Sequence, residues 1–181
     1  QAVYANEDYE PYAIKRDESI KKLLQTKDIK FNTFKDQVIF AKNDILKNDN
    51  SPYTVFTPYK NKWLSKFNID EQILNQYSEI NSNYFENQFN FPSIEELGFQ
   101  RSTIKVSDYN LDHIENYNEV RNFPALNQTS FLSPHLRFGT VSIRKIIQQT
   151  KFNQNFLNEL IWREFFMQIL FHFPSVVHSN F

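Results

Sequence analysis

The chain of 181 residues has no cysteine, only two glycines and no long apolar run. Without cysteine it can form neither a disulfide nor a cysteine-ligated metal site. Two glycines are too few for the phosphate loops and tight turns of a complete nucleotide-binding α/β domain. No stretch is long enough to cross a bilayer, and the N-terminus lacks a basic-then-apolar signal. These absences favour a cytoplasmic protein that has no membrane partner.

Net charge is also almost absent, with 20 Lys and Arg against 21 Asp and Glu. Residues 117–181 nevertheless carry six basic and three acidic side chains, and this mildly basic part is compatible with phosphate contacts. The four histidines show no metal-ligand spacing beyond one loose pair near the C-terminus, so no metal site is expected. Neither common glycine-rich nucleotide loop occurs.

The most informative stretch is 156–174, which has twelve apolar residues in nineteen and no proline before its last position. Its length and composition predict a buried helix. Helical spacing places Glu159, Trp162, Arg163 and Phe166 on one face. This pattern indicates either the wall of a cavity or a core helix whose Glu159 and Arg163 form an ion pair four residues apart.

The N-terminal third has the pattern of the last portion of an α/β layer. We expect a strand ending at 3–5, a helix over 11–25, and strands at 29–31 and 37–40 separated by a turn at 32–33. A further helix is expected over 55–67. Residues 68–107 are rich in polar and aromatic residues with weak periodicity, which predicts a long linker.

Helical spacing returns at 108–120. Ser133 and Pro134 predict a helix start, Gly139 predicts its end, and Ser142 is expected to cap the next helix. The hydroxyls of Thr129, Ser130 and Ser133 precede this helix start. They suit either a phosphate seat or ordinary N-capping.

Four sequence blocks together resemble the DNA photolyase/cryptochrome family, in order and in approximate spacing. They are V-Y-A-N-E-D-Y-E-P-Y-A-I-K-R-D at 3–17, Y-T-V-F-T-P-Y-K-N-K-W at 53–63, R-N-F-P at 121–124 with T-S-F-L-S-P-H-L-R-F-G-T-V-S-I-R at 129–144, and N-E-L-I-W-R-E-F-F at 158–166. The resemblance implies an α/β plus all-α fold. It assigns 1–67 to the C-terminal part of an α/β antenna domain, 68–107 to the interdomain linker, and 108–181 to the N-terminal part of a helical FAD-binding domain. The chain is then expected to be a central fragment of a longer protein, inactive on its own and unable to hold FAD tightly.

The resemblance further implies a deoxyribodipyrimidine photolyase, most like class I, a carbon–carbon lyase that uses reduced FAD and blue light to repair cyclobutane pyrimidine dimers. UV-damaged DNA is the implied partner and a monomer is expected. Glu159 and Trp162 match the catalytic residues that contact the dimer, and these two with Arg121 and Arg163 form the implied DNA-binding set. The implied FAD contacts are Tyr117, Thr129, Ser130, Phe131, Leu132, Ser133 and Phe156.

Three departures from the family pattern bear on this assignment. Phe156 stands where many bacterial photolyases have a tryptophan beside the flavin, and Asn122 replaces the usual aspartate. Tyr12-Ala13 replaces the Asn-Glu of folate-antenna enzymes, which argues against that folate site and leaves the identity of a second antenna chromophore open. One alternative is a cryptochrome, a flavin photoreceptor without repair activity, and another is a helical DNA-binding module without flavin. The pairing of Glu159 with Trp162 favours repair.

Overall fold

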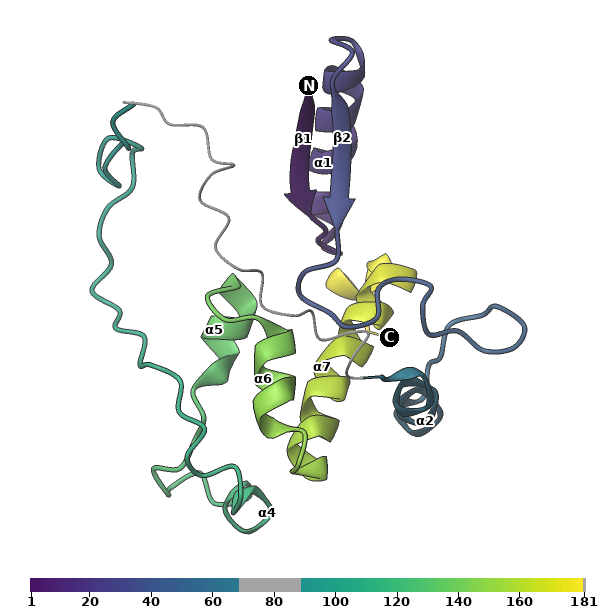
Figure 1. Cartoon of the computed structure of the whole chain (residues 1–181), viewed down its shortest axis with the longest axis vertical. Coiled ribbons are helices and arrows are strands. Elements are labelled where there is room, and N and C mark those ends of the chain that lie inside the picture. The colour runs from purple at the N-terminus through teal and green to yellow at the C-terminus, as the bar shows by residue number, and fades with distance from the viewer. Residues whose placement is uncertain (69–88, 181) are drawn as a thin grey trace.

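The computed structural model describes residues 1–68 and 89–180, and its N-terminal part is a parallel strand–helix–strand unit (Figure 1). Strand β1 (Ala2–Asn6) pairs with β2 (Lys30–Phe34) in the register Ala2↔Lys30 to Asn6↔Phe34. Helix α1 (Pro11–Gln25) makes the crossover that a parallel pair requires. Pro11 occupies its first turn, where the missing N–H costs nothing.

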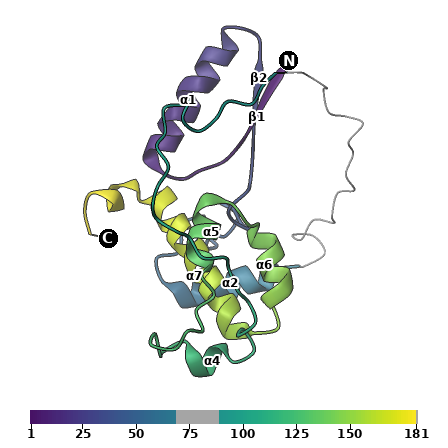
Figure 2. The ribbon, with the colours of Figure 1, turned by 90° about the vertical axis from the view of Figure 1, so that its left-hand side faces the viewer.

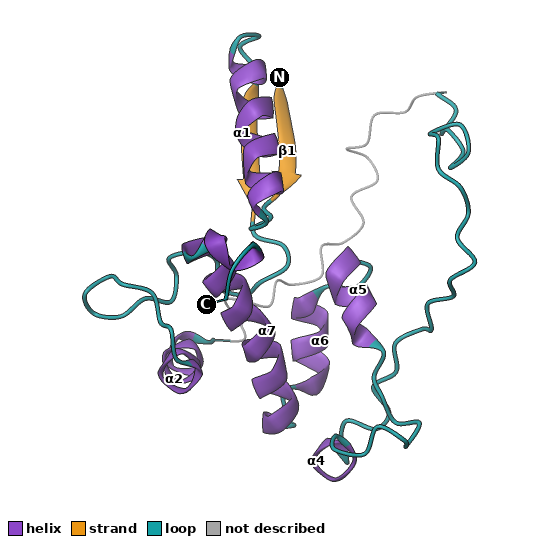
Figure 3. Ribbon diagram, turned by 180° about the vertical axis from the view of Figure 1, so that it is seen from behind, coloured by secondary structure: helices purple, strands orange, loops and turns teal. Residues whose placement is uncertain are grey.

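Helices form the other part of the molecule, beside the strand unit (Figure 2). Their bounds are α2 (Phe56–Lys66), α4 (Tyr117–Val120), α5 (Leu132–Phe138), α6 (Ile143–Thr150), α7 (Gln154–His172) and the 3₁₀ turn η2 (Pro174–Val177). Figure 3 shows long loop segments between α2 and α5, where 89–107 contains no helix or strand. Among the described residues, no helix is both long enough and apolar enough to span a bilayer.

The main core lies where α2, α5, α6 and α7 meet. Trp63, Tyr59, Ile146 and Ile161 are fully buried there. A smaller core joins Tyr9 near the strand unit to the C-terminal half of α7. The apolar length of α7 is therefore explained by its contacts with both parts of the molecule.

Local signals placed several helix ends correctly. Ser142 accepts a hydrogen bond from the Arg144 N–H at 3.3 Å and caps α6. Gly139 ends α5 at φ 67°, the left-handed conformation that glycine adopts most readily. The helices predicted at 11–25, 55–67 and 156–174 are confirmed within two residues at each end.

Other predicted elements are wrong. Residues 37–40 form no strand, and Asn32 and Thr33 lie inside β2 rather than in a turn. The helix predicted over 108–120 is reduced to α4 at its end. Ser133 is not an N-cap, because α5 begins at Leu132 with Phe131 before it and has no side-chain cap. The predicted linker lies partly outside the described residues.

Candidate functional site

A cavity of about 640 Å³ opens between α7, α5 and the loop region around α4. The α7 wall consists of Phe156, Glu159, Leu160, Arg163 and Met167, which share one face because they follow helical spacing. Such a volume lies within the range of pockets that hold small molecules and cofactors. The predicted buried helix is therefore also the wall of a cavity.

Most of the residues predicted as site residues line this cavity. They are Tyr117, Arg121, Thr129, Ser130, Leu132, Ser133, Phe156, Glu159 and Arg163. These residues are up to 46 positions apart in the sequence, from Tyr117 to Arg163. The fold therefore places side chains from separate segments around one cavity. Asn110, His113 and Arg137 also line the cavity and were not predicted.

Two predicted site residues lie elsewhere. Trp162 stacks on Phe56 of α2 with ring centroids 3.6 Å apart and planes 9° from parallel. Phe131, at φ 53°, is 40% exposed. Trp162 and Glu159 are close on the helix, but they face different neighbours, because Trp162 points towards α2 and Glu159 towards the cavity.

The cavity contains an ion pair between Arg121 and Glu159. One guanidinium nitrogen of Arg121 lies 2.8 Å from Glu159 Oε1, and each side chain is 36% exposed. The Arg121 guanidinium also lies 5.2 Å from the centre of the Tyr117 ring, within cation–π range. Partial burial and the charge of Glu159 raise the pKa of the Tyr117 hydroxyl. The alternative ion pair, Glu159 with Arg163, does not form.

Polar contacts, two of them buried, fix the loop that forms the cavity floor. Asn153 donates from Nδ2 to the Ile114 carbonyl at 2.7 Å, and its Oδ1 accepts from the Phe156 N–H at 3.0 Å as the N-cap of α7. His135 bonds the Ser107 carbonyl through Nε2 at 2.9 Å. The floor is thus tied both to the start of α7 and to α5.

Glu164, the neighbour of Arg163, has a role that the sequence did not reveal. It is 3% exposed, and its carboxylate accepts hydrogen bonds from the Ile39 N–H at 2.7 Å, the Phe40 N–H at 2.9 Å and the Trp63 indole at 2.7 Å. Burial raises the pKa of this carboxyl from 4.5 to about 7, although these donors oppose the shift. Its only sequence signal was a charge inside an apolar helix.

The donor set of the cavity suits a ligand that has both aromatic and anionic parts. Tyr117 and Phe156, whose rings meet edge to face at 5.0 Å, offer an apolar surface. The hydroxyls of Thr129, Ser130 and Ser133 and the guanidinium of Arg163 can contact phosphate oxygens. The residues present therefore fit a dinucleotide cofactor with a flat ring system.

Comparison with known proteins gives a consistent result. The family model of DNA photolyase matches residues 1–77. The deoxyribodipyrimidine photo-lyase of Vibrio cholerae is 28% identical over 98% of this chain and 43% of that protein. The Synechococcus protein of the same name is also 28% identical, over 100% of this chain and 44% of its own length. This chain thus spans less than half the length of these relatives.

Solved structures of similar fold cover nearly the whole chain. A class III photolyase from Agrobacterium tumefaciens has a TM-score of 0.71 at 21% identity, over 99% of this chain and 42% of that one. A Sulfolobus tokodaii photolyase, solved with two FAD molecules, has a TM-score of 0.64 at 26% identity, over 99% and 40%. A Synechocystis cryptochrome has a TM-score of 0.71 at 16% identity, over 98% and 43%. This chain is thus similar in sequence to deoxyribodipyrimidine photo-lyases, and in fold to photolyases and a cryptochrome.

Proposed function

We propose that this chain carries part of the FAD pocket and lesion site of a deoxyribodipyrimidine photolyase, which repairs cyclobutane pyrimidine dimers in UV-damaged DNA. The observation that supports the proposal best is the cavity, because nine residues selected from sequence motifs line it together. When bound, fully reduced FAD supplies one electron under blue light and receives it back after the two cyclobutane carbon–carbon bonds have broken. A second chromophore remains part of the proposal without an assigned site.

The chain's own residues have distinct roles in this proposal. Glu159 accepts a hydrogen bond from a base of the dimer, and Arg121 contacts the DNA backbone. The Arg121–Glu159 pair at 2.8 Å must then open as the damaged dinucleotide enters. Because both side chains are one-third exposed, solvent screens the pair and its separation is inexpensive. A flipped dimer costs less to unstack than an intact base pair.

The same proposal divides the chain into three parts. Residues 1–67 are assigned to the α/β antenna domain, 68–107 to the linker and 108–181 to the helical FAD-binding domain. A monomeric state and a cytoplasmic location complete the proposal. The strand–helix–strand unit supports the α/β assignment of the first part, while α2 of the same part packs into the helical core.

Blue-light repair of an oligonucleotide with one thymine dimer tests the function. We expect Glu159→Gln to slow repair clearly, because a neutral amide oxygen accepts the hydrogen bond of a base N–H more weakly than a carboxylate does. Glu18→Gln, an exposed glutamate on α1, is the matched control and is expected to repair like the wild type. A full-length wild-type protein that contains this chain and holds flavin but repairs nothing contradicts the proposal.

One observation favours a photoreceptor without repair activity as the second candidate. Trp162 packs against Phe56 rather than facing the cavity, so its ring does not offer the stacking surface that a dimer needs. Trp162→Ala separates the two functions. A large loss of repair shows that the ring turns towards the lesion, whereas an unchanged light response without repair supports the photoreceptor.

A further inference from the structure

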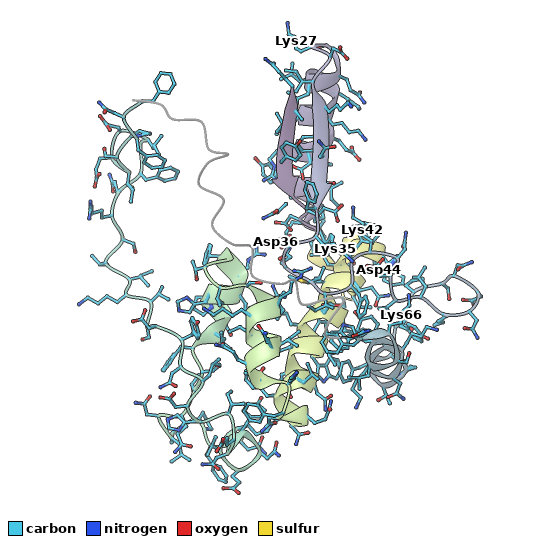
Figure 4. All side chains as sticks on the ribbon, viewed as in Figure 1. Lys27, Lys35, Asp36, Lys42, Asp44 and Lys66 are labelled. Atoms are coloured by element: carbon cyan, nitrogen blue, oxygen red, sulfur yellow. The ribbon has the colours of Figure 1, made fainter. Side chains whose placement is uncertain are left out.

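Residues 36–41 form a bent loop segment that runs from the strand unit to the helices and joins no sheet in the described part of the chain (Figure 1). Figure 4 shows Lys35, Asp36, Lys42 and Asp44 at this junction. Val38 and Ile39 are each 1% exposed, so the middle of the segment is deeply packed, while Asp36 at its start is exposed. Buried backbone groups need hydrogen-bond partners, and here no neighbouring strand supplies them.

Side chains supply these partners instead, one residue after another. Arg144 on α6 donates from its two terminal nitrogens to the carbonyls of Asp36 at 2.9 Å and Val38 at 3.1 Å. Arg163 donates to the Gln37 carbonyl at 2.6 Å. Asp44, from the loop that follows, accepts the Ala41 N–H at 2.9 Å.

Glu164 completes the set by accepting the N–H groups of Ile39 and Phe40. Its third bond, from the Trp63 indole, ties the same carboxylate to α2. Arginines thus bind the carbonyls of the first three residues, and the carboxyl groups of Glu164 and Asp44 bind the N–H groups of the last three. Charge-assisted bonds of this kind are among the strongest in proteins.

Arg163 connects this arrangement to the cavity. Its guanidinium donates to the Gln37 carbonyl at 2.6 Å and to the Leu136 carbonyl at 3.3 Å, while the side chain also lines the cavity. Because Arg163 and Glu164 are consecutive on α7, both grip the same short segment from adjacent positions. The place of the Arg163 charge in the cavity therefore depends on where that segment lies.

We propose that Arg144, Arg163 and Glu164 form a clamp on residues 36–41, and that Glu164 is a positioning residue that fixes the Arg163 guanidinium at the cavity wall for an anionic ligand. The clamp itself follows from the contacts above. The identity of the anionic ligand, the phosphates of FAD, rests on the proposed function.

Two measurements on Glu164→Gln test the proposal. The amide group keeps the shape of the side chain but turns an NH₂ towards a backbone donor, so we expect hydrogen exchange of 36–41 to rise by about tenfold or more. We also expect FAD affinity to fall by about tenfold, while affinity for riboflavin, which lacks phosphates, changes much less.

Arg144→Leu is the second variant, and it tests the clamp even if Glu164→Gln does not fold. It removes two bonds to 36–41 at the edge of the clamp and should speed exchange there. Lys145→Leu, its exposed neighbour on α6, is the matched control and should leave exchange unchanged.

The possible outcomes distinguish the clamp, the positioning role of Glu164 and the proposed function. Faster exchange together with a selective loss of FAD affinity supports the clamp and the positioning role. Faster exchange with equal losses for FAD and riboflavin overturns positioning, and unchanged exchange in both folded variants overturns the clamp. If a full-length protein that contains this chain binds neither flavin, the proposed function fails, while the exchange result still decides for or against the clamp.

Discussion

Replacing Glu164 by glutamine should change how stability depends on pH. Burial raises the pKa of the Glu164 carboxyl from 4.5 to about 7 in the folded protein. In the unfolded chain the group regains its ordinary pKa, so between these values the folded state binds more protons than the unfolded state. The wild-type free energy of unfolding therefore has a contribution that is present below pH 4.5 and is lost as pH rises through 7.

The size of this effect follows from the shift. One pKa unit corresponds to about 1.4 kcal/mol, so the contribution of Glu164 amounts to about 3 kcal/mol across the full range. Glutamine does not titrate. The stability of wild type relative to Glu164→Gln should therefore fall by up to that amount as pH rises. Tyr9 and Tyr59 lie nearby, but burial raises the pKa of both hydroxyls further above neutrality, so neither titrates in this window.

Urea unfolding from pH 5 to pH 8 measures the difference. Tryptophan fluorescence is a direct probe, because the Trp63 indole donates to Glu164 at 2.7 Å. Glu18→Gln, at an exposed position on α1, controls for the general loss of a carboxylate and should differ from wild type by a nearly constant amount. A Glu164→Gln difference that is flat or grows with pH would refute the reasoning.

Three further predictions concern stability and the cavity floor. Ile146→Ala removes a side chain that is 0% exposed and should lower the free energy of unfolding by about 3 kcal/mol in urea titration. Gly139→Ala adds a Cβ with open space around it at φ 67°, so only backbone strain remains, which should cost about 1 kcal/mol in thermal unfolding. Asn153→Ala removes the α7 cap and the bond to the Ile114 carbonyl, which should cost about 2 kcal/mol and speed hydrogen exchange around 114.

A matched control variant for each of these three substitutions distinguishes its specific effect from a general loss of stability. Val177→Ala, at an exposed position, should cost far less than Ile146→Ala. Gly139→Asn should recover part of the loss seen with alanine, because asparagine tolerates the left-handed conformation. Gln154→Ala, next to Asn153 and exposed, should leave exchange around 114 unchanged. Equal effects within any of these pairs would contradict the mechanism assigned to it.

Local sequence signals predicted the elements whose ends depend on nearby residues. Pro11, Ser142 and Gly139 act within one turn of the helix ends that they mark, so their effects are visible in the sequence. The apolar length of α7 likewise required a buried helix. Confirmed elements are those for which short-range chemistry and long-range packing agree.

The errors arise where distant partners decide the structure. Residues 37–40 have the apolar, β-branched pattern of a strand, but their backbone partners are side chains more than 100 positions away. Ile114 follows helical spacing, yet its carbonyl is bound by Asn153 and the chain there turns. Trp162 shares a helix face with Glu159 in projection, but stacking on Phe56 decides its direction. These partners are distant in the sequence, so no local sequence pattern could have predicted them.

The bonds that hold residues 36–41 end on main-chain atoms, and this gives the two sides of the contact different mutational tolerance. Any residue except proline can present the same N–H and C=O groups, so the exposed positions of the segment can change with little effect on its bonds. Arg144, Arg163 and Glu164 have no such freedom, because lysine cannot reproduce the two-pronged guanidinium bond and aspartate is one methylene too short. A mutational scan should therefore find the helical side of this contact far less permissive than the segment that it holds.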